Sequence, residues 1–484
     1  MINLKEHIKL TGVYTFFAVF PALLQLIVYP VIEGTDRLGA QDFGYLAIAE
    51  ALLSFLVIFC LNGMAITIAR YYYDYCDEKS GYKKLVSTIF SGVIIRAAVI
   101  IALLVVFSPI IGSFFPKGPL QNFESYGIFL GIIAFNRSVI SVALSLYRSE
   151  KSIRNFISVS LISGLCRSLF QIIGVLYFDL SFIGYLMGTA IGGSIANISI
   201  LTYTYFNNGI HFSSTIRKQL RSFALPLALT DIMYWGIMFF DRFLLMKNPT
   251  QLGIYDNAMK FAAGVLFITQ GLAGSVQPEL FRLFKKGIKE NEKDIKSLSN
   301  IFVAENILAV GVFALPLILF INIFYETELL LSAGLLMIIL VKFVFNAQFQ
   351  IFSWPILYNK NSKLYFLLNL ITFLVLVGLN ILLVPSLGYY GSIISFLAAG
   401  FVQVFAFYLA QRKIIAIPWN LKKVMLFPIT IVLFTVIMEY IKIHFELNPI
   451  ITSIIVVVYI FSGLILLYKT DILKILSKIK QRYN

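Results

Sequence analysis

The sequence predicts an all-α polytopic membrane protein with about 14 transmembrane helices. We expect two pseudo-symmetric six-helix lobes followed by two further helices, with both termini cytoplasmic. Three observations support this prediction: the composition, the distribution of basic residues among the connections, and an internal duplication. Of the 484 residues, 59% are hydrophobic and only 13% are charged. Since a soluble domain has about 25% charged residues, this composition excludes an ordinary soluble enzyme.

Fourteen apolar stretches are long enough to cross a bilayer, which requires about 20 residues. The connections between them are short, which leaves no room for a large catalytic domain outside the membrane. In chain order, the predicted segments are 12–32, 45–69, 85–108, 124–147, 156–178, 183–205, 222–246, 253–280, 299–324, 329–356, 364–384, 389–410, 424–443 and 450–468.

Basic residues alternate between the two sides of the predicted bundle. The N-terminus, the even-numbered connections and the C-terminal tail contain 29 Lys and Arg residues, whereas the odd-numbered connections contain only Arg37, Lys117 and Lys247. Cytoplasmic loops are enriched in Lys and Arg, so this bias places both termini inside. The net charge of +15 is therefore attributed to membrane topology, and no nucleic-acid partner is expected.

The chain also repeats itself. Two six-helix halves would enter the membrane from the same side, as parallel repeats do in transporters. We therefore predict an N-lobe at 1–210, a C-lobe at 211–423, and two extra helices with a basic amphipathic tail at 424–484. Four matches occur in order at an offset of 207 to 211 positions: Ala40–Tyr45 with Pro249–Ile254, Asn62–Ala65 with Gln270–Ala273, Leu146–Tyr147 with Leu357–Tyr358, and Phe182–Gly184 with Tyr389–Gly391.

A motif in the second half is similar to a known family. The chain has Leu225-Pro226-Leu227, then Asp241-Arg242-Phe243, then Gly253-Ile254-Tyr255 and Ala258-Met259-Lys260. This pattern resembles the polysaccharide-export branch of the multidrug/oligosaccharidyl-lipid/polysaccharide (MOP) exporter superfamily, and in particular the Wzx-type O-antigen flippases. Asp241 and Arg242 are its motif residues.

The resemblance implies a two-lobed helical bundle whose central cavity is lined mainly by the first, second, seventh and eighth segments. It also implies alternating access in the bacterial cytoplasmic (inner) membrane. The implied substrate is a polyprenyl-pyrophosphate-linked oligosaccharide, such as an O-antigen repeat unit. Membrane lipids and the polysaccharide polymerase machinery are the other implied partners. No cofactor is expected beyond H⁺ or Na⁺, one of which could drive transport.

Six basic residues lie inside the predicted segments. Each costs about 2.5–3.5 kcal/mol at mid-bilayer on insertion scales, so most should face protein, water or an anionic ligand. Since the candidate partners Glu50, Asp231, Asp241 and Glu305 are fewer than the bases, some positive charge should remain for a pyrophosphate. Buried ion pairs or snorkelling are the alternative. The six basic residues are Arg96, Arg137, Arg167, Arg242, Lys260 and Lys342.

Helical periodicity aligns polar residues into stripes. At 100° per residue, Asp256, Lys260 and Gln270 share one face of 253–280, and Asp231, Trp235 and Arg242 share one face of 222–246. Such faces should line a cavity or a contact between lobes, although a hydrogen-bonded seam between helices would also explain them. Tyr14, Ala18, Pro21, Gln25 and Tyr29 form a similar face on 12–32.

These faces complete the predicted site. The expected substrate-binding residues are Arg96, Arg137, Arg167, Lys260, Lys342, Tyr29, Trp235 and Gln270, with the two aromatic residues stacking on sugar rings. Proline removes a backbone donor and can kink a helix, so Pro21 and Pro226 are expected to let their helices bend. The expected coupling and gating residues are Asp231, Glu305, Glu50, Asp256, Pro21 and Pro226.

Other functions remain open at this point. A lipid II flippase would share the basic interior and the two extra helices. A multidrug or cation extruder of the same superfamily would need an acidic cavity, against which the intramembrane bases argue. A polytopic glycosyltransferase or polymerase is a remote alternative, because the sequence has no long outer loop. We expect no enzyme activity and no metal site, since the sequence contains neither GxxxxGK[ST] nor HExxH.

Overall fold

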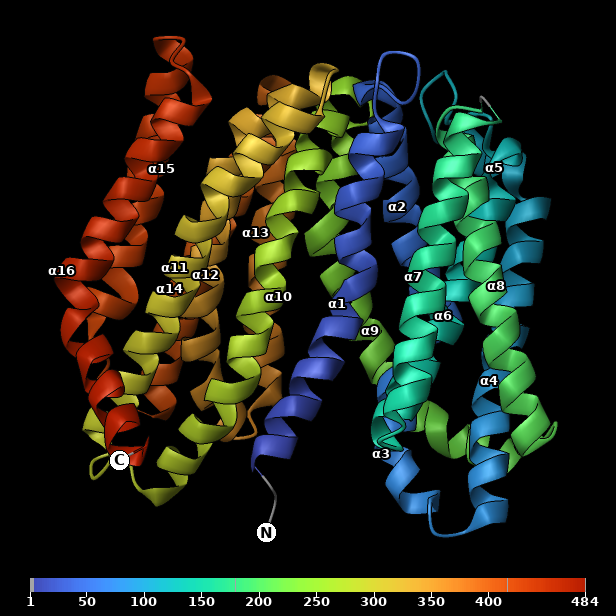
Figure 1. The fold of residues 1–484 in the computed structure, drawn as a ribbon, viewed down its shortest axis with the longest axis horizontal. Coiled ribbons are helices and arrows are strands. Elements are labelled where there is room, and N and C mark those ends of the chain that lie inside the picture. Colours follow the sequence, from blue (N-terminus) through green and yellow to red (C-terminus); the bar gives the residue numbers. More distant parts are fainter. Residues whose placement is uncertain (1–3, 179, 416, 484) are drawn as a thin grey trace. The chain divides into compact units, whose positions relative to one another are not determined.

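Long apolar helices make up the chain in the computed structural model, which describes residues 4–178, 180–415 and 417–483 (Figure 1). Within these residues no strand occurs, and a single bridge joins Glu33 to Leu38. Thirteen stretches are long and apolar enough to cross a membrane, and a shorter apolar stretch, Phe16–Ile32, lies in the first helix. The predicted all-α membrane fold is therefore confirmed, while the cytoplasmic position of the termini stays a prediction.

Contacts divide the chain into two units, Met1–Gly253 and Ile254–Asn484. The ninth helix packs with the second and third helices, so the N-terminal unit extends beyond residue 210. The predicted lobe boundaries at 210 and 423 stay predictions. The helices of the N-terminal unit are α1 (Leu4–Ile32), α2 (Ala40–Leu61), α3 (Met64–Tyr75), α4 (Lys79–Val106), α5 (Ser108–Ser113), η1 (Phe123–Ser125), α6 (Gly127–Ser149), α7 (Ile153–Leu176), α8 (Phe182–Asn208), α9 (Ser214–Leu245) and the first turn of α10 (Pro249–Lys286).

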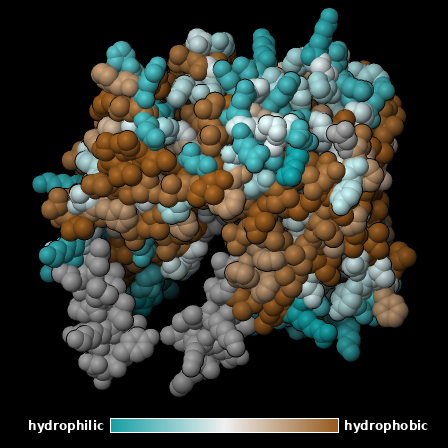
Figure 2. Space-filling view, turned by 45° about the horizontal axis from the view of Figure 1, so that its top comes forward, coloured by the Kyte–Doolittle hydropathy of each residue, from teal (hydrophilic) through white to brown (hydrophobic). Residues whose placement is uncertain are grey.

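The C-terminal unit contains the rest of α10 and the remaining helices. Apolar side chains gather over the helix flanks in Figure 2, whereas hydrophilic ones gather at the upper end of that view, as suits a multi-pass membrane protein. The side chains of the predicted amphipathic tail beyond Asp471 lie outside the described residues. The further helices are α11 (Glu292–Phe324), η2 (Glu328–Leu331), α12 (Ser332–Tyr358), α13 (Ser362–Leu387), α14 (Tyr389–Ile414), η3 (Lys422–Leu426), α15 (Phe427–His444) and α16 (Pro449–Tyr483).

The tightest helix pair of the N-terminal unit is α7 with α8, and glycine makes it possible. Gly184, Gly188 and Gly192 recur every fourth residue along one face of α8. A Cβ added at Gly188 would lie 2.0 Å from the Phe170 carbonyl oxygen of α7. Small residues at this spacing let membrane helices approach backbone to backbone, so α7 and α8 form one rigid pair.

The second membrane segment is not the single helix that was predicted at 45–69. It breaks between α2 and α3, where Asn62 and Gly63 both take the left-handed conformation, with φ of 48° and 68°. Asn and Gly adopt this conformation at the least steric cost. The prediction missed the break because the apolar pattern continues through it.

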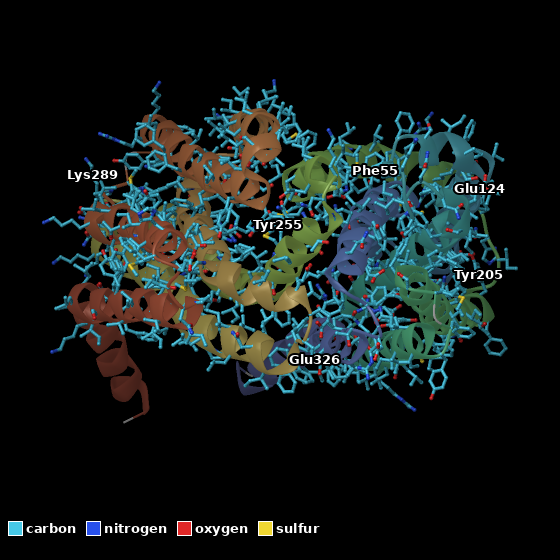
Figure 3. All side chains as sticks on the ribbon, turned by 90° about the horizontal axis from the view of Figure 1, so that it is seen from above. Phe55, Glu124, Tyr205, Tyr255, Lys289 and Glu326 are labelled. Atoms are coloured by element: carbon cyan, nitrogen blue, oxygen red, sulfur yellow. The ribbon has the colours of Figure 1, made fainter. Side chains whose placement is uncertain are left out.

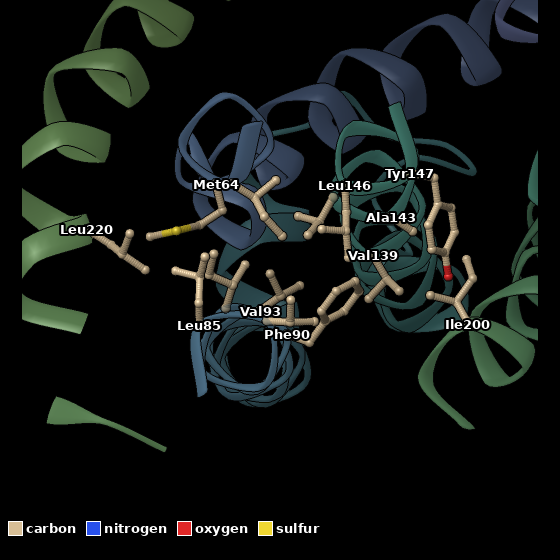
Figure 4. Packing of buried hydrophobic residues seen from close by; sticks show 14 of the residues in the cluster. Met64, Leu85, Phe90, Val93, Val139, Ala143, Leu146, Tyr147, Ile200 and Leu220 are labelled. Carbon is tan, nitrogen blue, oxygen red and sulfur yellow. The ribbon is translucent and has the colours of Figure 1, made fainter. Parts of the chain in front are cut away.

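Beyond the break, α3 packs into the core of the N-terminal unit. Figure 4 shows Met64 of α3 beside Leu85 of α4, with Phe90 and Val93 reaching Val139 of α6. These side chains are nearly or fully buried. Burial of apolar surface of this kind contributes about 25 cal/mol per Å² in a water-exposed region, and within the bilayer close packing takes over that role.

The duplication is visible in the backbone. Lys151 and Lys360, 209 positions apart, both have a left-handed conformation, with φ of 56° and 57°. Ser181 and Gly388, which precede α8 and α14, share φ near 55° and ψ near −140° (54°, −140° and 57°, −137°). Such conformations are uncommon outside glycine, so their recurrence at equivalent positions supports the two-repeat organisation.

Candidate functional site

An ion pair joins two helices in the interior of the N-terminal unit. Glu50 lies on α2 and Arg137 on α6. Arg137 donates from Nη1 to Oε1 at 2.5 Å and from Nη2 to Oε2 at 2.9 Å, a geometry that fixes both groups in orientation. Both side chains remain 33% exposed. Arg137 is therefore paired with an acid, as the alternative interpretation of the intramembrane bases expected. The pair lies where solvent or a ligand can still reach it.

A second guanidinium lies beside this pair. Arg167 of α7 interacts electrostatically with Arg137 and Glu50, and also with Tyr29 of α1. Its Nη2 donates to the Pro21 carbonyl at 3.2 Å, while Nε is buried without a hydrogen-bond partner in the described part of the chain. Two guanidinium groups against one carboxylate leave one positive charge in excess. We call Glu50, Arg137 and Arg167 the basic cluster.

The polar face predicted on the first helix partly serves as a helix–helix seam. Gln25 of α1 donates to Gln171 Oε1 at 3.0 Å and accepts from the Tyr185 hydroxyl at 3.0 Å. Gln171 then donates to Thr189 of α8 at 2.9 Å. These bonds connect α1 to the rigid α7–α8 pair, directly beside the basic cluster, and they hold its helices in place.

Arg96 has a different environment from the other arginines. From α4 it donates through Nε to the Cys60 carbonyl at 2.9 Å and through Nη2 to the Leu61 carbonyl at 3.4 Å. These carbonyls lie at the end of α2, just before the break at Asn62, where the last helical carbonyls lack intrahelical donors. The guanidinium thus caps a helix C-terminus, a position that favours positive charge.

Both predicted prolines lie inside helices, Pro21 in α1 and Pro226 in α9. Pro226 lies next to the break in α2–α3: a Cβ at Gly63 would be 2.8 Å from the Ala224 carbonyl oxygen. A proline-containing helix and an interrupted helix therefore meet in one place, where both have weakened backbone hydrogen bonding.

The two aromatic candidates for sugar stacking pack within the N-terminal unit. Trp235 of α9 donates to the Ala51 carbonyl at 2.8 Å, and its ring lies 4.7 Å from that of Phe55, which Figure 3 marks on α2. Tyr29 is buried, with its ring 5.8 Å from that of Phe43. Trp235 thus joins α9 to α2, and Tyr29 forms part of the environment of Arg167.

The motif residues Asp241 and Arg242 are both buried in the N-terminal unit. Arg242 Nη1 lies 3.2 Å from Asp241 Oδ1 and donates to the Met238 carbonyl at 2.5 Å. Its guanidinium carbon lies 4.7 Å from the centroid of the Phe239 ring. The motif therefore forms a compact network at the end of α9.

The predicted residues of the C-terminal unit lie on α10, α11 and α12. Lys260 pairs with the buried Asp256, one turn earlier on α10, at 2.8 Å. Lys342 of α12 is buried, with Nζ 3.9 Å from the centroid of the Phe396 ring. Gln270 is exposed on α10. Tyr255, which Figure 3 marks, lines a small cavity together with Lys342.

Two carboxylates stand apart from these pairs. Asp231 of α9 and Glu305 of α11 are half-buried within membrane segments. Across the described residues, neither has an ion-pair or hydrogen-bond partner. The pairing considered as an alternative for them is not seen, so both remain candidates for binding a coupling ion.

Sequence reasoning missed two kinds of polar residue. Gln171 and Tyr185 escaped notice because isolated amides and hydroxyls are common in apolar segments. The buried pair Glu439–Lys442 on α15, at 2.5 Å, could have been found, since an acid and a base three residues apart share a helix face. This pair and the Lys442 bond to the Gly334 carbonyl attach α15 to α12.

The chain is similar to known proteins both in sequence and in fold. A family model described as "Polysaccharide biosynthesis protein" matches residues 37–284. The fold is similar to that of the lipid II flippase MurJ in an inward closed conformation, with a TM-score of 0.70, 16% identity, and coverage of 95% of this chain and 99% of that one. It is also similar to an inward-facing multidrug resistance MATE family transporter of the MOP superfamily, with a TM-score of 0.66, 15% identity, and coverage of 81% and 94%. No curated protein sequence matches the chain.

Proposed function

Because the chain belongs to the polysaccharide biosynthesis protein family and has a fold shared with MOP-superfamily transporters, we propose that it is a flippase for a lipid-linked oligosaccharide. In this proposal it moves a polyprenyl-pyrophosphate-linked repeat unit from the inner to the outer leaflet of the bacterial cytoplasmic membrane. The sugars cross by alternating access while the lipid tail stays in the bilayer. No covalent chemistry is performed on the substrate.

The observation that carries the proposal is the excess positive charge of the basic cluster. Guanidinium groups bind phosphate oxygens in a bidentate manner, and the unpartnered, buried Nε of Arg167 is a donor that a phosphate oxygen would satisfy. The Glu50–Arg137 pair limits the net charge to one unit. Moderate attraction suits a transporter, because the substrate must also leave.

Membrane potential can supply the energy. A pyrophosphate diester has about two negative charges, and each gains about 2.3 kcal/mol per 100 mV when it moves outward across an inside-negative membrane. Uniport would therefore be favoured by about 4–5 kcal/mol per 100 mV if the whole charge crosses the field. Coupling to H⁺ or Na⁺ through Asp231 or Glu305 is the alternative energy source.

The first test is genetic. Deleting the gene should strip surface polysaccharide and leave lipid-linked repeat units on the inner leaflet, where mass spectrometry identifies the glycan. Complementation with Arg167→Ala should fail at normal protein levels, and Arg167→Lys should restore part of the export. Arg70→Ala is the matched control, because Arg70 forms an exposed pair with Asp74. Normal surface polysaccharide in a deletion strain without a paralogue would contradict the proposal.

A lipid II flippase is the second candidate, supported by the likeness in fold to MurJ. It would use the same cluster for the same pyrophosphate, so charge does not distinguish the two substrates. The accumulated lipid does: a muropeptide-linked intermediate on depletion would favour lipid II, whereas a repeat-unit glycan without peptide favours the polysaccharide branch. A cation extruder is disfavoured, because the excess positive charge of the basic cluster would repel a cationic substrate.

A further inference from the structure

A cavity with a mixed polar and apolar lining lies between α7 and α8 on the surface of the N-terminal unit, and no residue of the basic cluster lines it. Its volume is about 150 Å³, and its lining includes Tyr147, Asn155, Ser158, Ser199 and Tyr203. Asn155 Nδ2 donates to the Tyr203 hydroxyl at 3.3 Å. The Ser199 hydroxyl donates to the Ile195 carbonyl, and Val159, Ile162 and Ile200 complete the lining. Hydroxyl and amide groups beside apolar side chains suit an amphipathic occupant, which has both a polar and an apolar part.

The cavity opens on a surface that is otherwise apolar. Ile162 of α7 and Ile198 and Phe206 of α8 are exposed, the last at 88%. Exposed apolar side chains on membrane-spanning helices face lipid. Two lining residues, Tyr147 and Ile200, lie side by side at the edge of the packed core (Figure 4). Since Asn155 lies in the first turn of α7, the cavity is at the level where acyl chains meet headgroups.

Basic residues surround the same end of these helices. Arg148, Lys151 and Arg154 all lie exposed in or next to the turn between α6 and α7. The one acid of this turn, Glu150, accepts a hydrogen bond from the Tyr82 hydroxyl, and burial raises the pKa of its carboxyl group. The charge presented toward the membrane surface is therefore positive.

We propose that the α7–α8 cavity binds an anionic glycerophospholipid. The phosphate lies at the basic turn near Lys151 and Arg154. The polar headgroup is held by Asn155 and Tyr203, and an acyl chain runs along Ile162. Basic pockets between membrane helices bind anionic headgroups in this manner. This inference concerns a bound membrane lipid, not the cargo, and does not rest on the proposed function.

The second repeat provides an internal comparison. Its α12–α13 turn has Lys360 and Lys363 at the positions of Lys151 and Arg154, 209 residues later, and Lys360 has the same left-handed backbone as Lys151. The polar lining is not repeated. Counted from the helix starts, the residues equivalent to Asn155, Ser158, Ser199 and Tyr203 are Leu364, Leu367, Ala406 and Ala410. Both repeats have a basic turn. In the N-terminal repeat this turn adjoins hydroxyl and amide groups, whereas the second repeat has apolar residues at the same four positions.

Native mass spectrometry of the full-length protein tests the proposal. Detergent-purified protein is mixed with dioleoyl phosphatidylglycerol or dioleoyl phosphatidylethanolamine, and the fraction with bound lipid is measured over a titration. We expect preferential retention of phosphatidylglycerol. Each basic side chain near an anionic surface contributes about fivefold in affinity, so Lys151→Ala/Arg154→Ala should weaken retention about 25-fold. Lys360→Ala/Lys363→Ala is the matched control and should leave the tightest binding event unchanged.

The lining is tested separately. Asn155→Leu/Tyr203→Ala, which copies the second repeat, should lose the tight binding event although the basic turn remains. Melting temperatures without added lipid show that each variant is folded, and only the wild type and the control variant should gain stability from phosphatidylglycerol. The proposal would be overturned if the protein retained both lipids equally. It would also be overturned if the two basic-turn double variants lost binding equally, or if the lining variant bound phosphatidylglycerol as the wild type does. Binding of polyprenyl phosphate instead, or a dimer through this face, would also overturn it.

Discussion

Glu50 of α2 and Arg137 of α6 form a two-point ion pair, with N–O distances of 2.5 Å and 2.9 Å, that joins two helices of the N-terminal unit. The pair links α2 to α6, and the adjacent Arg167 adds a second guanidinium group. Removing one member of this partly exposed pair leaves the other charge without its partner between the helices, which costs more than the pair contributes.

We therefore predict that Arg137→Ala lowers the melting temperature and the protein level. The double variant Glu50→Gln/Arg137→Gln should recover most of that stability, because no uncompensated charge remains. Export by the double variant should remain at least about tenfold below wild type, since a phosphate-binding group is missing. Thermal unfolding in detergent and surface polysaccharide assays measure the two effects. Normal export by the double variant would show that Arg137 serves only the fold.

Arg96 should contribute to stability but not to export. Arg96→Ala leaves the Cys60 and Leu61 carbonyls without their donor, at a cost of about 1–3 kcal/mol for each buried group that stays unsatisfied. We expect a lower melting temperature, partial recovery in Arg96→Lys, and export that falls only in proportion to the folded protein. If Arg96→Ala is fully stable but cannot export, Arg96 belongs to the substrate path and not to the helix break.

Gly44 and Gly253 occupy equivalent positions in the two repeats, and both lie in the N-terminal unit. A Cβ at Gly44 would lie 1.9 Å from the Pro249 carbonyl oxygen, and one at Gly253 would lie 1.9 Å from the Ala40 carbonyl oxygen. Because backbone cannot yield as a flexible side chain does, either change to Ala should destabilise by about 1–3 kcal/mol.

The control for these glycine variants is Gly378→Ala on α13, where nothing lies within 4 Å of an added Cβ. Alanine is the better helix former by about 1 kcal/mol, so this variant should be neutral or slightly stabilising. Thermal unfolding of all three variants gives the comparison. Equal stability of Gly44→Ala and Gly378→Ala would mean that the two helix starts do not pack as closely as described.

Asp231 and Glu305 test the energy source. In liposomes with membrane potential and pH gradient imposed separately, we expect potential alone to drive flipping of a lipid-linked oligosaccharide. The rate should be unchanged in Asp231→Asn and Glu305→Gln if transport is uniport. Flipping that requires a pH or Na⁺ gradient, and disappears in either variant, would reject uniport and place the coupling ion at the substituted carboxylate.

The family resemblance between Leu225 and Lys260 and the duplication were both readable from short motifs. The sequence matches at an offset near 209 are local. The structure adds a further match at the same offset, the left-handed backbone of Lys151 and Lys360. The six intramembrane bases were also recognisable from their cost in lipid. The sequence did not reveal which base pairs with which acid, because Glu50 and Arg137 are 87 positions apart and no local pattern relates them.

The sequence by itself determined the membrane helices and their order, and it pointed to a two-repeat organisation. These features depend on composition and on periodicity within single helices, which the bilayer enforces on each segment separately. Only the tertiary structure decided that Arg96 caps a broken helix, that Gln25 belongs to a seam, and that Arg167 keeps an unpartnered donor beside the Glu50–Arg137 pair. Those roles depend on which helices are neighbours, because Arg96 and Cys60 are 36 positions apart in the chain and Gln25 and Gln171 are 146 apart.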